Sequence, residues 1–306
     1  MRWILLALAM LLVPKPALAW GNQGHQLTCQ IAYGLLTPKA KSEVDRLLAT
    51  QQPKYRKFAP ACTYADAVKF QDGRQSWHFV NLRRTDSALS PGTPCPVASS
   101  PTACLLPAIE LDYATLADKS ASAAVRGKAL MYFGHWLGDL HQPLHISFKD
   151  DIGGNKVETT GACAPRGGST YLHSIWDTCI IVQRIYANRP KVDLTDDPRF
   201  YTVTDQLRAA ITPEMRTDWL AGTTMDWANA SFAISTSASV GYCTKMQGAC
   251  WYSPTLMIHG DEDARSFEID DDYLTRFAPR VIEQLQRGGV RLADRLNRAL
   301  DPGYTG

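Results

Sequence analysis

The chain of 306 residues lacks any apolar run long enough to cross a membrane. A spanning helix needs about 20 consecutive apolar residues. The longest run, residues 3–13, has 11 and is soon interrupted by Pro14 and Pro16. We therefore expect no membrane anchor.

This apolar run has the flanks of a secretory signal. Met1-Arg2 supplies a positive start, and Ala17-Leu18-Ala19 is a small-x-small cleavage pattern. We predict a signal peptide over residues 1–19 and a mature domain over 20–306 that begins at Trp20. The mature protein would be secreted or periplasmic.

An excess of positive charge is also missing. The chain holds 32 Lys and Arg against 30 Asp and Glu, and removal of Arg2 and Lys15 with the signal peptide leaves the two signs equal. This balance excludes a nucleic-acid binder that is driven by general electrostatic attraction. An anionic substrate would need a local site, such as bound metal ions.

The sequence contains no C-x-x-C pair, which disfavours a cysteine metal site. It has eight cysteines, all after residue 19, and an even number in an exported protein favours disulfides. Sequence does not fix their connectivity, although two pairs are close enough to staple single loops. The candidate bridges are those two, Cys95–Cys104 and Cys243–Cys250, together with Cys29–Cys62 and Cys163–Cys179.

Internal repeats, composition breaks and long strictly alternating segments are absent, which argues against repeat, two-domain and all-β architectures. Apolar residues recur at three-to-four spacing over 27–36, 105–117, 123–140 and 277–300. We therefore predict a mainly α, single-domain fold. The polar, Pro- and Gly-rich connections 87–101, 150–169 and 235–254 all hold cysteines and are expected to be disulfide-stapled loops.

Histidine and aspartate occur twice at helical spacing. His135 and Asp139 stand four apart in a predicted helix, and His173 and Asp177 repeat the spacing. Such pairs project from one helix face and can grip an ion such as zinc. A single copy would usually be a surface ion pair. Both copies lie among Trp and Leu residues, however, and a third histidine, His145, follows the first helix, which favours metal binding.

Further residues become candidate metal ligands because they occur together with these two pairs. Asp66 precedes Lys69 by three residues, and His78 lies in an aromatic setting; alone, they would be a surface acid and a core histidine. At the mature terminus, the α-amino group of Trp20 can lose its proton near neutral pH and bind a metal, with His25 five residues on. The alternative there is a frayed terminus.

These motifs together resemble the S1/P1 nuclease family, the secreted zinc nucleases that prefer single strands. The resemblance covers the whole mature chain. It rests on Trp20-Gly-x-x-Gly-His25, Asp66-x-x-Lys69, Trp77-His78-Phe79, His135-Trp-Leu-Gly-Asp139-Leu-His-Gln-Pro-Leu-His145, Gly153-Gly154-Asn155, Leu172-His173-Ser-Ile-Trp-Asp177 and the final segment 289–297.

The resemblance implies the helical fold shared with zinc phospholipase C, and three Zn²⁺ ions per chain. Carried over by position, one ion takes Asp66, His78, His135 and Asp139; a more exposed ion takes His145, His173 and Asp177; the third takes Trp20, His25 and Asp139. Asp139 would bridge the two buried ions. His141 and His259 are left over and are expected to be structural or surface residues.

The implied activity is an endonuclease that hydrolyses phosphodiester bonds of single-stranded RNA and DNA to 5′-phosphates. 3′-Mononucleotides are further candidate substrates, and we expect a monomer. Asp66 would orient the attacking water, and Lys69 would offset charge on the phosphate. Phe79 is a candidate to stack a base, Asn81 to contact it, and Asn155 to add a hydrogen bond.

Two other interpretations compete. Zinc phospholipases C share the leading Trp and the H-x-x-x-D spacing, but in their pattern the last ligand is Glu, where this chain has Asp177, and the first histidine lies farther from the Trp than His25 does. A secreted protein with purely structural zinc is disfavoured because His145, His173 and Asp177 supply three ligands, whereas structural sites are normally closed by four.

Overall fold

The computed structural model describes residues 20–97, 102–186, 195, 197–241, 244–246, 249–251 and 266–306. The predicted signal peptide, His259, and Cys243 of the candidate Cys243–Cys250 bridge lie outside these residues. No helix in the described ranges is both long and apolar enough to span a membrane.

The fold is mainly helical, as predicted. The four helices expected from periodicity are present; α5 and α6 have the expected bounds, whereas α1 begins at Asn22 and not at residue 27. The last is longer than expected, since α11 begins at Asp271. The α-helices are α1 Asn22–Gly34, α2 Pro38–Leu48, α3 Phe58–Ala61, α4 Tyr64–Val68, α5 Leu105–Ala117, α6 Ala123–Leu140, α7 Leu172–Ser174, α8 Arg199–Ala209, α9 Pro213–Leu220, α10 Thr224–Ser235 and α11 Asp271–Leu300.

Short 3₁₀ and π-helical turns connect these helices at several points. The 3₁₀ turns are η1 Pro53–Tyr55, η2 Gln75–His78, η3 Pro143–His145 and η7 Ala238–Val240, and the π-helical turns are η4 Ile175–Cys179 and η5 Ile181–Ile185. Two of the 3₁₀ turns end on a predicted metal ligand.

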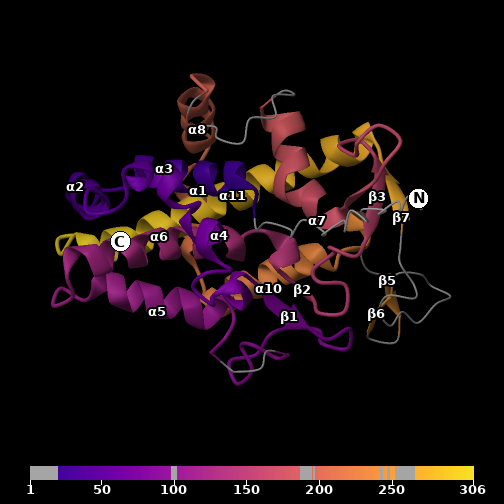
Figure 1. Ribbon diagram of the computed structural model, residues 1–306, viewed down its shortest axis with the longest axis horizontal. Coiled ribbons are helices and arrows are strands. Elements are labelled where there is room, and N and C mark those ends of the chain that lie inside the picture. Colours follow the sequence, from indigo (N-terminus) through magenta and orange to yellow (C-terminus); the bar gives the residue numbers. More distant parts are fainter. Residues whose placement is uncertain are drawn as a thin grey trace, which may run out of the picture.

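The core forms where α1, α6 and α11 pack against one another, while α5 and α6 form a helical hairpin on one side (Figure 1). Glycines allow α6 to approach α1 closely. A Cβ at Gly134 would lie 2.5 Å from the Cys62 sulfur, and one at Gly138 would lie 2.5 Å from His25 Nδ1. This close contact brings the first turn of α1 against the centre of α6.

The strands are short and form separate small sheets. β1 (Val80–Leu82) pairs in parallel with β2 (Ile146–Phe148), with Val80 opposite Ile146. β3 (Glu158–Gly161) lies between β4 (Thr170–Tyr171) and β7 (Ser266–Ile269), and β5 (Thr244–Met246) pairs with β6 (Ala249–Trp251). The β3 strand and the β5–β6 hairpin fall in segments that we expected to be loops.

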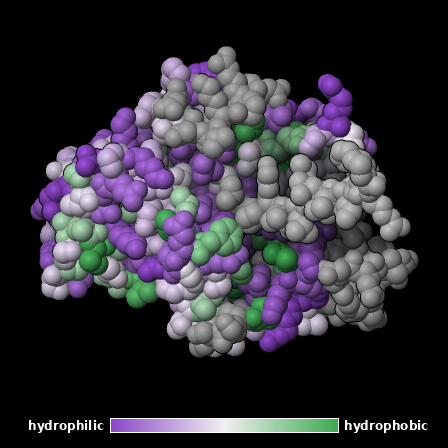
Figure 2. Space-filling view, in the orientation of Figure 1, coloured by the Kyte–Doolittle hydropathy of each residue, from purple (hydrophilic) through white to green (hydrophobic). Residues whose placement is uncertain are grey.

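Three disulfides join described residues: Cys29–Cys62, Cys95–Cys104 and Cys163–Cys179. They are three of the four candidate pairs, and two of them staple the connections 87–101 and 150–169. The surface seen in Figure 2 is largely hydrophilic, with apolar residues in small groups. The most exposed large apolar side chains include Phe70, at 61 % exposure, and Ile152, at 51 %.

Candidate metal centre and active site

The first predicted pair lies in the middle of the core. His135 and Asp139 are one turn apart on α6, both fully buried, and His135 Nε2 is 3.2 Å from Asp139 Oδ2. Ser122 caps the start of this helix, and the helix ends at Leu140, shortly before Pro143. The predicted exit of His145 from the helix end is therefore observed.

The second pair, His173 and Asp177, has the expected spacing, but its two residues do not lie in one α-helix. His173 lies in α7, but Asp177 lies in the π-helical turn η4, where the Ile180 N–H donates to the Ile175 carbonyl. His173 Nε2 and Asp177 Oδ2 are nonetheless 3.3 Å apart. π-Helical turns are rare and occur frequently at functional sites, where they alter the direction of side chains.

The parallel pairing of β1 and β2 joins the two halves of the site. His78 ends the turn before β1, and His145 ends the turn before β2. His145 Nδ1 accordingly lies 2.6 Å from the His78 carbonyl oxygen. The His78 ring reaches the α6 pair, with Nδ1 3.0 Å from His135 Nε2 and 3.1 Å from Asp139 Oδ2.

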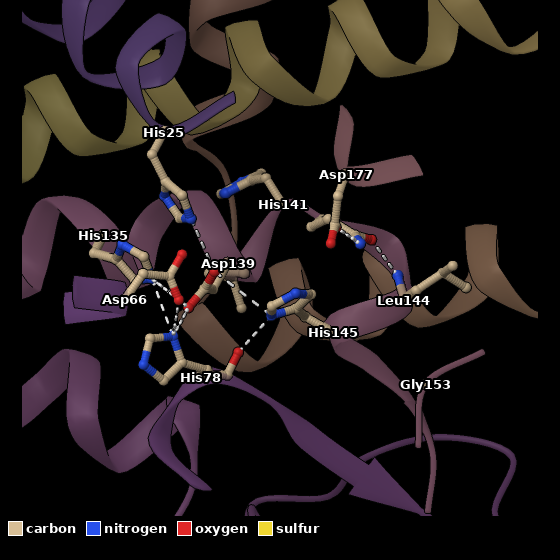
Figure 3. A network of polar contacts seen from close by, with 12 residues as sticks. His25, Asp66, His78, His135, Asp139, His141, Leu144, His145, Gly153 and Asp177 are labelled. Atoms are coloured by element: carbon tan, nitrogen blue, oxygen red, sulfur yellow. Dashed lines mark hydrogen bonds and ion pairs between the residues drawn. The ribbon is translucent and has the colours of Figure 1, made fainter. Parts of the chain in front are cut away.

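Helices α4 and α1 carry two further candidate ligands, Asp66 and His25 (Figure 3). Asp66 Oδ1 is 3.7 Å from His78 Nδ1, and it accepts a hydrogen bond of 3.1 Å from Lys69 Nζ. Lys69 is 5 % exposed, which excludes a solvated surface lysine. His25 Nε2 is 3.3 Å from Asp139 Oδ1, so Asp139 contacts ligands on both sides.

Trp20 is completely buried beside the first turn of α1. A Cβ at Gly24 would lie 2.9 Å from the Trp20 ring and Cβ, and the Gly21 N–H donates to the Asp177 carbonyl at 3.1 Å. Trp20 and Gly21 are thus packed against both α1 and the second pair, which excludes an exposed Trp20.

Three groups of buried His and Asp side chains have ligand atoms within 4.8 Å of one another. They are His78, His135 and Asp139; His25, Asp66 and His135; and His145, His173 and Asp177. These groups contain every predicted histidine and aspartate ligand.

Backbone carbonyls fix which ring nitrogen carries hydrogen in His135, His145 and His173. The Nδ1 atoms of His135, His145 and His173 lie 2.6–2.7 Å from the carbonyls of Cys62, His78 and Gly153. A carbonyl only accepts, so each Nδ1 is the donor and, in the neutral ring, each Nε2 is a bare acceptor. His145 Nε2 and His173 Nε2 nevertheless face each other at 3.2 Å.

Burial shifts the pKa values of most of these groups toward their neutral forms, whereas the Asp139 and Asp66 carboxylates raise the pKa of His135. Burial lowers the pKa of His173 to about 4 and those of His25 and His145 well below the usual range. It raises the pKa of Asp139 to about 7 and that of Asp177 well above its ordinary value. A cation bound here would replace the protons on these carboxyl groups.

Several polar atoms at the centre have no hydrogen-bond partner among the described residues, a costly arrangement in a buried site. They include both ring nitrogens of His25, Asp66 Oδ2 and Asp139 Oδ1. Together with the opposed Nε2 atoms of His145 and His173, they form a set of imidazole and carboxylate donors that suits borderline divalent cations. The residues present therefore fit the predicted metal ions.

A pocket of about 220 Å³ opens beside the residues that follow the candidate ligand His78. Phe79 and Asn81, two of the predicted substrate-binding residues, line it together with Val97 and the disulfide-bonded pair Cys95 and Cys104. Phe79 is partly exposed and directly follows His78, so its ring is not simply part of the core.

The predicted residue Asn155 makes a local contact instead of projecting freely. Its side-chain amide donates to the Ile152 carbonyl at 2.7 Å. Ile152 itself has a left-handed backbone, φ 57°, followed by Gly153 and Gly154 at 61° and 81°. A β-branched residue rarely adopts this conformation, and such outliers concentrate at functional sites.

Sequence reasoning missed the groups that hold the ligands in place. Gln142, fully buried, donates from its side-chain amide to Asp177 Oδ1 and accepts from the Leu144 N–H through Oε1. Its position between the candidate ligands Asp139 and His145 was the available signal. The carbonyls of Cys62 and Gly153 have no sequence signal, because every residue has one.

His141, left out of the predicted ligand set, is structural. It is fully buried, its Nδ1 donates to the Leu137 carbonyl at 2.7 Å, and its Nε2 lies 2.7 Å from an Arg291 nitrogen. Burial and the Arg291 charge hold its pKa well below the usual range.

Comparison with known proteins points to one family. The family model described as S1/P1 Nuclease matches residues 20–301. Endonuclease 2 of Arabidopsis thaliana is 28 % identical over 91 % of this chain and 90 % of its own length. Nuclease S1 of Aspergillus oryzae is 23 % identical, covering 95 % and 96 %, and Nuclease P1 of Penicillium citrinum is 24 % identical, covering 91 % and 97 %.

These matches favour the nuclease over the phospholipase interpretation, and the buried His and Asp groups agree with a metallonuclease. The chain belongs to the S1/P1 nuclease family and is a phosphodiesterase hydrolase that acts on nucleic acids.

Proposed function

We propose that the protein is a secreted or periplasmic, monomeric endonuclease that uses three zinc ions to cleave single-stranded RNA and DNA, leaving 5′-phosphates. 3′-Mononucleotides are a second candidate substrate. The 3.2 Å approach of His145 Nε2 to His173 Nε2 carries the metal assignment. Two lone pairs at this distance repel each other, and a shared cation turns the repulsion into binding.

The ligand sets follow the contacts around Asp139. Its Oδ2 faces His78 and His135, and its Oδ1 faces His25. One ion would therefore take Asp66, His78, His135 and Asp139, and another would take Trp20, His25 and Asp139. A third ion would take His145, His173 and Asp177.

Bound zinc would supply Lewis acidity, polarising a phosphate oxygen and lowering the pKa of water. The three ligands of the third set leave a position for substrate, since catalytic zinc sites keep one position open. Imidazole and carboxylate ligands are those that zinc prefers in such sites.

Asp66 and Lys69 act on the reacting groups. Asp66 Oδ1 accepts from Lys69 Nζ, while Oδ2 has no hydrogen-bond partner within the described residues. We assign Oδ2 to orient the attacking water through a hydrogen bond. The Lys69 ammonium would bind a phosphate oxygen and stabilise the charge that develops on it.

The pocket beside Phe79 supports single-strand preference. An unpaired base can leave its stack and enter the pocket against the Phe79 ring, with the Asn81 amide at its edge. A base held in a duplex would first have to be extruded, at a cost of a few kcal/mol. Exposed Ile152 is a further candidate substrate contact because it directly precedes Gly153, which holds His173.

The deciding experiment is metal analysis of protein that begins at Trp20, with nuclease activity followed through chelation and zinc return. We expect about three zinc ions per chain, activity that tracks occupancy, faster cleavage of single-stranded than double-stranded substrate, and 5′-phosphate ends. Full activity in protein stripped of metal would contradict the proposal.

A further inference from the structure

The loop that orients His173 is anchored by a buried ion pair outside the metal cluster. Arg84, two residues after β1, donates from Nε to Asp150 Oδ2 at 2.8 Å and from Nη2 to Asp151 Oδ2. Its guanidinium also stacks on Phe148, 4.2 Å from the ring centre. The Arg84 side chain is only 9 % exposed, and Asp151 is 1 % exposed.

Asp151 connects this ion pair to the backbone that contacts the candidate ligand His173. Its other oxygen, Oδ1, accepts the Gly154 N–H at 3.0 Å, and the Gly153 N–H donates to the Phe148 carbonyl at 2.9 Å. These bonds hold both sides of the Gly153 carbonyl, which accepts from His173 Nδ1 at 2.6 Å.

The anchored segment contains one strained residue, Ile152, because a β-branched side chain disfavours a left-handed backbone. Ile152, Gly153 and Gly154 have consecutive left-handed backbones. Gly153 is also squeezed, since a Cβ there would lie 2.5 Å from the Leu144 carbonyl oxygen. Conformations of this kind persist only where the surroundings over-determine them.

We propose that Arg84 is a positioning residue for the metal ion at His145, His173 and Asp177. It acts through Asp151, which fixes the Gly153 carbonyl and with it the tautomer and direction of the His173 ring. This inference rests on the proposed third ligand set. It assigns a role in metal affinity to a residue that touches neither metal nor substrate.

The chain offers a matched control at the neighbouring position. Arg83 has the same chemistry, but its side chain is 61 % exposed, pairs with Asp86 at 3.6 Å and donates to the Pro96 carbonyl at 3.0 Å. The test compares Arg84→Gln, Arg83→Gln and wild type as zinc-loaded enzymes. Arg84→Lys, which keeps the charge but not the fork of donors, tests for partial rescue.

The main measurement is zinc affinity, by competition with a fluorescent chelator. In Arg84→Gln we expect one of three ions to bind about 10–100-fold more weakly, the range for loss of a partner that orients a metal ligand. The other two ions should be unchanged, as should all three in Arg83→Gln. Amide hydrogen exchange at Gly153 and Gly154 should speed up in Arg84→Gln alone, and Arg84→Lys should fall between.

Three results would overturn the proposal in distinguishable ways. If wild type holds three ions and Arg84→Gln holds them equally tightly, Arg84 does not position the ligand, whatever the loop exchange shows. If wild type itself takes up no ion at His145, His173 and Asp177, the three-ion function fails and the role of Arg84 fails with it. A uniform loss of all three ions in Arg84→Gln would indicate general destabilisation and would also contradict the proposal.

Discussion

His135 and Asp139 meet one helical turn apart on α6, with His135 Nε2 3.2 Å from Asp139 Oδ2 and neither side chain exposed to solvent. The other oxygen of the same carboxylate lies 3.3 Å from His25 Nε2 on α1. One side chain therefore contacts the histidines of two proposed ligand sets, which come from different helices.

Asp139→Asn should consequently remove both buried ions. We expect zinc content to fall from about three ions to about one, and kcat to fall by at least about a hundredfold, because metal catalysis contributes several kcal/mol. Metal analysis of the purified variant tests this. Asp112→Asn is the control: Asp112 is also buried but bonds to the Trp136 indole, so this variant should keep three ions.

Trp20 provides a test of the proposed terminal ligand. A chain with even one residue before Trp20 has no free α-amino group there, so we expect it to hold two ions and to lose most activity. The measurement is zinc content and nuclease activity against the chain that starts at Trp20. Equal activity of the two forms would show that the terminus is not a ligand.

Lys69→Met should slow catalysis without removing metal. Loss of the ammonium should lower kcat by about 10²–10³-fold, the usual effect of losing one group that stabilises the transition state. Zinc content should stay at about three. Lys128→Met on α6 is the matched control. The Lys128 ammonium lies 5.8 Å from the centre of the Tyr132 ring, and Lys128 belongs to none of the proposed ligand sets. Loss of zinc in Lys69→Met would show instead that Lys69 supports the ligands.

Zinc affinity should depend on pH through the carboxyl groups. The pKa of Asp139 in the metal-free site is about 7, so below that pH the ion must displace its proton and affinity must fall. The pKa of His173 is about 4, so this ring competes only in stronger acid. Calorimetry at pH 6 in buffers of different ionisation enthalpy should detect proton release. Equal affinity at pH 6 and pH 8 would contradict this prediction.

Substitutions of Ile152, whose backbone is strained, should affect stability and substrate binding differently. Glycine relieves the left-handed strain, about 1–2 kcal/mol for other residues, but it also loosens the unfolded chain. We therefore expect Ile152→Gly to keep or slightly raise the free energy of unfolding, while KM for single-stranded oligonucleotides rises several-fold. Ile152→Ala should raise KM equally without relieving strain. An unchanged KM in both would exclude Ile152 from the substrate site.

Spacing alone predicted the two His–Asp pairs, because positions four apart on a helix are neighbours whatever the rest of the fold does. Asp66, His78 and Trp20 reach the cluster through the packing of α4, β1 and α1, and they were predicted through the family resemblance. The π-helical turn at Asp177 was not predicted, because π-helical bonding leaves no clear periodic pattern. Arg84 was also missed, since its partners Asp150 and Asp151 lie some 66 residues away in sequence.

The packing of α1 against α11 has a consequence for when the enzyme becomes active. Gly289 of α11 approaches so closely that a Cβ there would lie 2.5 Å from Ile31, on the helix that carries His25. The proposed ligands all occur by residue 177, yet α1 gains this support only when the last thirty residues of the helical domain have been made. We therefore expect activity to appear only after α11 has been made and has folded onto α1, and after removal of the residues before Trp20 has freed its α-amino group.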